Sequence, residues 1–92
     1  MIYVLNKCWG GFSLSQFAME QLGVDDAYAD LTSEQIGKLV NLINEHGSEK
    51  CSGSHAKLVV VEIPNNYTDI EWDDYDGIER ITYVVDGKIY HA

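Results

Sequence analysis

The residues that decide the fold are 68–91, TDIEWDDYDGIERITYVVDGKIYH. Apolar and polar side chains alternate through much of this stretch, a period typical of strands that bury one face. The turn-forming residues 74–77 interrupt the alternation. Asp86-Gly87 follows and is the strongest short signal for a two-residue hairpin. We therefore predict three consecutive antiparallel strands over 68–73, 78–85 and 88–91.

Two more strands are expected earlier in the chain. Residues 1–6 and 58–63 are both short and apolar, and the second of them, LVVVEI, is apolar almost throughout. A strand with so few polar residues is covered rather than exposed. We expect helices to cover one of its faces and Pro64 to end it.

The segment between these strands carries the start and stop signals of two helices. In a capping box, a Ser or Thr and a Gln three positions later each bond a free backbone N–H at the helix start. Such pairs occur at Ser13 with Gln16 and at Thr32 with Gln35. Apolar residues then recur at helical spacing. Glycine adopts the left-handed conformation at low cost, so we expect the helices to end at Gly23 and Gly47.

Together these signals predict an α+β fold with a single domain, residues 1–92. The expected order is β-α-α-β-β-β-β, with two helices packed on one face of an antiparallel sheet of about four or five strands. Residues 47–56 are expected to form a flexible loop. No apolar run approaches the roughly 20 residues of a transmembrane helix, and the N-terminus lacks the pattern of a secretion signal.

The composition limits the partners that the chain can bind. Its 92 residues carry 15 acidic side chains against 6 Lys and Arg, a formal net charge of −9. This charge opposes binding to nucleic-acid phosphates and anionic membranes, and it favours basic partners. With 46% hydrophobic residues the sequence is too apolar for a disordered acidic tail. The two cysteines are too few for a disulfide scaffold, and we expect them to be reduced.

Residues 69–79 carry six carboxylates and no Lys or Arg. In a strand, Asp69, Glu71 and Asp73 share one face, whereas Ile70 and Trp72 share the other. Any single carboxylate is best explained as part of a solvated face. The group as a whole repels itself and costs stability, which favours a binding role such as imitation of nucleic-acid phosphates. The predicted partner-binding residues are Asp69, Glu71, Trp72, Asp73, Asp74, Tyr75, Asp76 and Glu79.

Other sites are less well supported. Binding of Ca²⁺ or Mg²⁺ is disfavoured because the acidic segment lacks the ligand spacing of a calcium loop. An anion could bind where Gly10-Gly11 precede the first helix, because helix N-termini present free N–H groups. An ordinary glycine turn is the favoured alternative. The possible anion-binding residues are Lys7, Gly10, Gly11 and Ser13.

The residue pattern gives little support for a metal site or for a nucleophilic active site. Cys8, His46, Cys51 and His55 lack the paired spacing of zinc ligands. No Ser, His and Asp set has local support for nucleophilic catalysis. We therefore predict no metal, no cofactor and no enzymatic activity.

Three segments resemble a widespread group of small phage and prophage proteins. They are Asn6-Lys7-Cys8-Trp9-Gly10-Gly11-Phe12-Ser13-Leu14-Ser15, the segment 57–64 (KLVVVEIP) and the segment 70–79 (IEWDDYDGIE). The chain departs from the group's pattern at His55, where the group has Cys, and in a longer acidic turn. The resemblance implies a phage-related origin and action in the cytoplasm of a bacterial host. It transfers no catalytic residues.

These observations favour a non-enzymatic protein that inhibits a host defence component. Its carboxylates would occupy a basic, nucleic-acid-binding groove on a host protein such as a CRISPR effector, without direct nucleic-acid or membrane binding. One alternative is a small-molecule sponge that sequesters a nucleotide signal at Gly10-Gly11, and another is a phage structural or housekeeping protein. A homodimer is also expected, because residues 89–91 would leave an open sheet edge and Trp9 and Trp72 would be available for an interface.

Overall fold

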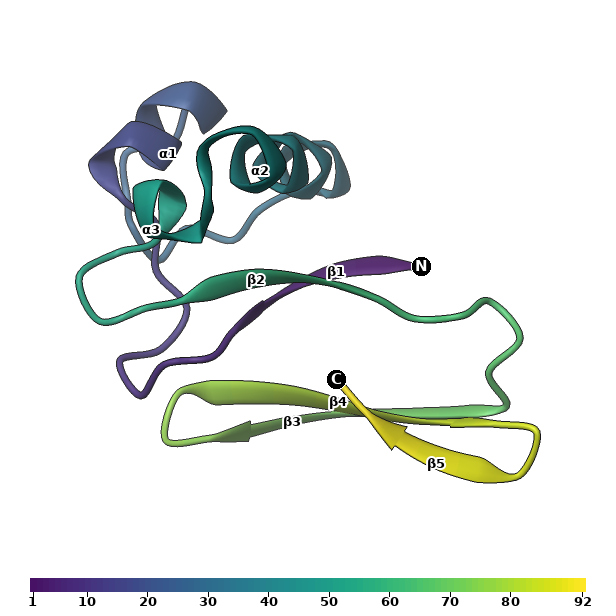
Figure 1. Ribbon diagram of the computed structural model, residues 1–92. Coiled ribbons are helices and arrows are strands. Elements are labelled where there is room, and N and C mark those ends of the chain that lie inside the picture. Colours follow the sequence, from purple (N-terminus) through teal and green to yellow (C-terminus); the bar gives the residue numbers. More distant parts are fainter.

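The chain folds into three layers in a computed structural model that describes residues 1–92 (Figure 1). Helices form the first layer, a two-stranded ribbon of β1 and β2 forms the second, and a three-stranded meander of β3, β4 and β5 forms the third. In chain order the elements are β1 (Ile2–Asn6), α1 (Gln16–Leu22), α2 (Ser33–His46), α3 (Ser48–Cys51), β2 (Leu58–Glu62), β3 (Asp69–Tyr75), β4 (Ile78–Val85) and β5 (Lys88–His91).

This architecture confirms the predicted α+β class and the order of the main elements. The strands differ from the prediction in one respect, because they form two antiparallel sheets instead of one. The ribbon and the meander stack face to face, and the three helices lie on the ribbon's opposite face (Figure 1).

The ribbon is buried on both faces. Its strands pair antiparallel from Ile2 opposite Glu62 to Asn6 opposite Leu58. Val4 and Leu58 pack with the helices, whereas Leu5 on the opposite face packs with the meander. The almost unbroken apolar run of β2 follows from this double cover, because a strand covered on both faces needs apolar residues at successive positions.

The second helix begins and ends as its sequence predicts. Thr32 Oγ1 accepts a hydrogen bond from the Gln35 N–H, and Gln35 Oε1 accepts one from the Thr32 N–H. Gly47 follows the last helical residue, and its N–H donates to the Ile43 carbonyl. Leu39 and Ile43 place the apolar stripe of α2 in the larger of the two cores.

The first helix begins later than predicted, and the capping box at Ser13 does not form. The N-cap is Ser15, whose Oγ accepts a hydrogen bond from the Ala18 N–H. Ser13 is instead buried, and its carbonyl accepts from the Gly53 N–H. The Leu14 N–H similarly donates to the Ala27 carbonyl. These long-range bonds hold the chain extended through the position where the local signal would start a helix. Gly23 ends α1 in the left-handed conformation, as expected.

The segment 47–56 is more ordered than the predicted flexible loop. It contains the short helix α3, and Cys51 at the end of α3 is fully buried in the larger core. Ser52 Oγ accepts a hydrogen bond from the Leu58 N–H at the start of β2. The segment thus fixes the ribbon against the helices.

Two Asp-Gly turns shape the meander. Asp76 and Gly77 have φ values of 51° and 84°, and Asp86 and Gly87 have values of 51° and 76°. Positive φ at both central residues defines the type I′ turn, whose twist matches that of paired strands. Because β3 extends to Tyr75, opposite Ile78, the first turn is shorter than the four residues predicted. The predicted hairpin at Asp86-Gly87 is confirmed, and β5 lies at the edge of the sheet.

The meander joins the ribbon through a small core and one tight backbone contact. The core consists of the buried side chains of Leu5, Ile63 and Ile81. At one end of the molecule, the turn at Gly77 packs directly on the loop that follows β1. A methyl group at Gly77 would lie 2.5 Å from the Gly11 nitrogen and 2.6 Å from the Trp9 carbonyl oxygen. None of the three helices has the length and apolar character required to cross a membrane.

The two Asp-Gly turns offer a matched test of this contact. Gly87→Ala introduces only the strain of a positive φ, because open space surrounds the added methyl group. We expect it to lower the free energy of unfolding by about 1–2 kcal/mol. Gly77→Ala carries the same strain and also collides with backbone atoms, so it should cost at least about 1 kcal/mol more. Urea denaturation of both variants measures the difference, and equal losses would contradict the packed junction.

Candidate protein-binding surface

The register of β3 against β4 assigns each acidic residue to a face of the meander. Trp72 lies opposite Ile81, which is buried against the ribbon, so this pair marks the inner face. Side chains alternate along a strand, so Asp69, Glu71 and Asp73 lie on the outer face. The structure therefore places these three carboxylates together, as the alternation in the sequence predicted. We refer to them as the acidic row.

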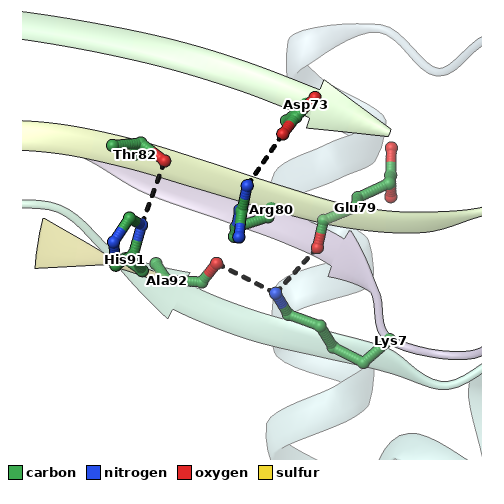
Figure 2. A network of polar contacts seen from close by, with 7 residues as sticks. All are labelled: Lys7, Asp73, Glu79, Arg80, Thr82, His91 and Ala92. Atoms are coloured by element: carbon green, nitrogen blue, oxygen red, sulfur yellow. Dashed lines mark hydrogen bonds and ion pairs between the residues drawn. The ribbon is translucent and has the colours of Figure 1, made fainter. Parts of the chain in front are cut away.

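The acidic row is exposed to solvent and only partly neutralised. Its members are two residues apart along an edge strand, so neighbouring side chains start roughly 6.6 Å apart. Asp73 forms an ion pair with Arg80 across the strands, with 2.9 Å between Oδ2 and Nη2 (Figure 2). Asp69 and Glu71 form no ion pair. Asp69 and Glu71 are thus unpaired, and the exposed ion pair of Asp73 is weak enough to open when a partner binds.

Four other residues of the predicted binding site lie on the inner face or in the turn, namely Trp72, Asp74, Asp76 and Glu79. Trp72 contacts the Tyr3 ring edge to face, at 6.0 Å between centroids, and is 52% exposed. Asp74 Oδ1 accepts a hydrogen bond from the Gly77 N–H within the hairpin turn. Glu79 is half-buried and accepts a hydrogen bond from the Asn6 N–H at 2.7 Å. Because the predicted set spans both faces, it does not form one continuous carboxylate surface.

The tip of the hairpin adds two residues, Ile78 and Arg80, to the predicted binding site. A shallow hollow of about 440 Å³ is lined by Asp73, Asp74, Tyr75, Ile78 and Arg80. Tyr75 is 77% exposed. Ile78 and Arg80 face Tyr75 and Asp73 across the strands. They would have been found by pairing the two strands through the Asp76-Gly77 turn, which fixes the register.

Asn6 is the polar centre of the junction behind this surface. Its side chain is fully buried, and Oδ1 accepts hydrogen bonds from the Cys8 N–H and, at 2.9 Å, from the Lys57 N–H. Nδ2 donates to the Cys8 carbonyl at 2.6 Å and to the Gly77 carbonyl. Every hydrogen-bonding position of the carboxamide is therefore used. In the sequence, Asn6 is notable only as the first residue of the segment 6–15.

Glu79 is the acidic residue whose ionisation the fold changes most clearly. Burial raises the pKa of its carboxyl above the ordinary value of 4.5, and the hydrogen bond from the Asn6 N–H opposes this shift. The charge of Asp74, opposite it on the inner face, also raises the pKa, whereas Trp72 and Lys7 lower it. Glu79 therefore supports the junction and is not part of the acidic row.

The residues of the possible anion site do not converge. The Lys7 ammonium donates to the Glu79 carbonyl at 2.7 Å and to the Ala92 carbonyl at 2.9 Å (Figure 2). Gly10 packs against His55, and its N–H donates to the His55 carbonyl. Ser13 is buried, and α1 starts only at Gln16. The prediction that the glycines lead directly into a helix N-terminus is wrong, because Ser13 and Leu14 form backbone hydrogen bonds with distant residues and the helix is capped only at Ser15.

The cysteine and histidine side chains do not gather into one metal site. His46 contacts the Phe17 ring edge to face, and His55 stacks on Trp9 with 4.7 Å between ring centroids. Burial raises the pKa of the Cys51 thiol, an effect that the nearby Lys50 partly opposes. No group of three His, Cys, Asp or Glu side chains is arranged to hold a metal ion.

Comparison with known proteins leaves the surface to be interpreted from its geometry. The chain matches no protein-family model, no curated protein and no solved structure. Its most distinctive exposed feature is the acidic row, with Tyr75 and Ile78 at the tip of the same face. Such an arrangement offers carboxylates to cations and a ring and aliphatic surface to the stems of basic side chains.

Removing the Asn6 side chain tests whether it joins the layers. Asn6→Ala leaves the Cys8 and Lys57 N–H groups and the Gly77 carbonyl without this partner. We expect the free energy of unfolding to fall by about 2–4 kcal/mol, because unsatisfied buried groups each cost about 1–3 kcal/mol. Asn44→Ala, at an exposed position of α2, is the control and should change stability by no more than about 0.5 kcal/mol. A similar small effect at Asn6 in urea denaturation would disprove its role.

Glu79→Gln should change how stability depends on pH. A carboxyl whose pKa is higher in the folded state binds its proton more tightly there, so its contribution favours folding at low pH. That contribution is lost as pH rises from the ordinary value of 4.5 through the raised folded value. The amide oxygen of the substituted side chain still accepts from the Asn6 N–H but carries no charge. We therefore expect the stability of the variant, relative to the wild type, to increase as pH rises through this range.

Denaturation at several pH values measures this difference, and the carboxyl carbon of Glu79, followed by NMR, reports its pKa directly. Asp74→Asn provides a second check, since it keeps Oδ1 for the Gly77 N–H but removes the charge. The pKa of Glu79 should fall in this variant. A stability difference that decreases with rising pH would contradict the assignment.

Proposed function

We propose that this chain is a non-enzymatic binding protein whose acidic row occupies a basic, nucleic-acid-binding surface on a partner protein. The observation that carries the proposal is the placement of Asp69, Glu71 and Asp73 on one uncovered sheet face. Carboxylates at alternate positions of an extended strand are spaced much like successive phosphates along a nucleic-acid strand. In a groove lined by Lys and Arg, these carboxylates would therefore stand at the positions that phosphates occupy when nucleic acid is bound.

The scaffold behind the row supports this use. The row stands on a strand paired along its whole length with β4. The Asp76-Gly77 turn at the end of that strand is fixed by the Asn6 side chain and by the loop at Trp9. Charges on a rigid element reach a partner without the entropic cost of ordering a flexible tail. The exposed Tyr75 adds an aromatic side chain of the kind that often contributes most binding energy in interfaces.

The biological setting of the proposal comes from the resemblance to phage and prophage proteins. We propose that the chain acts in the cytoplasm of a bacterial host and that its partner is a host defence protein, such as a CRISPR effector. Inhibition would follow from competition, because the partner's groove cannot hold the acidic row and nucleic acid together.

No specific observation favours the nucleotide sponge or a structural role. The Lys7 ammonium already bonds two carbonyl groups, and Gly10 is packed against His55. The homodimer stays a prediction.

Neutralising the acidic row tests the proposal. The variant Asp69→Asn, Glu71→Gln, Asp73→Asn keeps the size of each side chain and leaves the junction untouched. Tagged wild-type protein is first used to capture a partner from host lysate, and the partner's affinity is then measured against both forms. We expect the affinity of the variant to fall about tenfold or more and its salt dependence to weaken.

The matched control removes three exposed carboxylates from the helical layer instead, with Glu20→Gln, Glu34→Gln and Glu45→Gln. It has the same net charge as the row variant but should bind almost as the wild type does. Equal losses in the two variants would show that only net charge matters. A captured partner that still binds its nucleic acid when saturated with this chain would disprove competition.

A further inference from the structure

We infer that the free edge of β3 accepts an extended basic segment of the partner as a fourth strand of the meander. This inference rests on the proposed function in one respect, namely that the partner is a basic protein. It adds a binding mode, because backbone hydrogen bonds would supply affinity and the acidic row would select the occupant. Strand addition of this kind is a common way to recognise extended peptides.

The edge itself is long, regular and unoccupied. β3 is the outermost strand in the order β3-β4-β5, and all seven of its residues pair with β4 without a bulge. No other strand or helix lies beside its backbone. Half of the N–H and C=O groups of such a strand point away from the sheet and are available for pairing. β3 also lacks proline, and the charged side chains that protect its edge are all acidic.

The charge of β3 decides which strand can pair with it. Four of its seven residues are Asp or Glu, namely Asp69, Glu71, Asp73 and Asp74. A second copy of β3 would bring carboxylates against carboxylates, and like charges directly opposite one another destabilise a sheet. A strand with Lys or Arg at alternate positions would instead face each member of the acidic row with an opposite charge. The edge is therefore closed to its own copies and open to a basic segment.

The inner face specifies the remaining positions of the added strand. Ile70 and Trp72 alternate with the acidic row and point toward the ribbon side. The two-stranded ribbon covers this face incompletely, so Trp72 keeps 52% of its surface exposed despite its contact with Tyr3. Apolar residues on the added strand would cover the indole. The expected partner segment thus alternates basic with apolar or β-branched residues.

Three synthetic peptides, one unmethylated and two methylated, test the inference against the intact chain. The first is acetyl-Lys-Val-Lys-Thr-Lys-Val-Lys-amide, and the other two have the same sequence with alternate backbone nitrogens methylated, one in each register. Methylation keeps the charges and side chains but removes the N–H donors that would pair with β3. Binding is followed by NMR, using amide chemical shifts and hydrogen exchange of the labelled protein.

We expect the first peptide to shift amides along β3 and slow their exchange, and one methylated register to bind at least about tenfold more weakly. The acidic-row variant should bind the unmethylated peptide more weakly than the wild type does. Equal binding of all peptides would overturn strand addition while leaving charge imitation intact. Shifts confined to β5 or the helices, or no binding at millimolar peptide, would also overturn it. If the first peptide binds selectively but the chain displaces no partner from its nucleic acid, strand addition stands and only the proposed function is rejected.

Discussion

The carboxamide of Asn6 makes four hydrogen bonds at the point where the ribbon, the loop after it and the meander meet. The meander also rests on a small core of three fully buried side chains, on the tight contact at Gly77 and on the hydrogen bonds of Glu79 and Lys7. A core of that size provides little hydrophobic stabilisation, since each such side chain contributes about 1.5–3 kcal/mol when buried. The hydrogen bonds of Asn6 also fix the orientation of the meander, because all four can form only when the surrounding backbone groups are arranged in one way. The orientation of the acidic face therefore follows from a residue on the other side of the sheet.

The residues of this junction build the scaffold, whereas the residues of the acidic row face solvent. Asn6 and Gly10 come from the segment 6–15, and Gly77 and Glu79 come from the segment 70–79. The structure brings these segments together, with Gly77 packed on the Trp9–Gly11 loop and Glu79 bonded to the Asn6 N–H. The residues most distinctive in the sequence thus join the layers. Asp69, Glu71 and Asp73 lie outside this junction and can vary without disturbing it.

Much of the fold was predictable because its signals are local. The Asp86-Gly87 hairpin, the Thr32 capping box and the helix stop at Gly23 each depend on neighbours a few residues away. The predicted start of the first helix at Ser13 was wrong because hydrogen bonds from distant residues, such as that of Gly53, hold the segment extended. The division into two sheets was not predictable from strand patterns, which identify buried faces but not the layers that cover them.

The same limit of local patterns applies to the candidate surface. The alternation of side chains along the strand predicted that Asp69, Glu71 and Asp73 share a face. It did not predict that Glu79 points inward. The junction also affects how the chain reaches its fold. The hairpins of the meander close over two-residue turns, whereas Asn6 must find Lys57, 51 residues away, and Gly77, 71 residues away. Closing such long loops costs more entropy than forming a hairpin, and contacts distant in sequence slow folding. β1 is synthesised well before β2, so its asparagine remains without these partners until most of the chain exists.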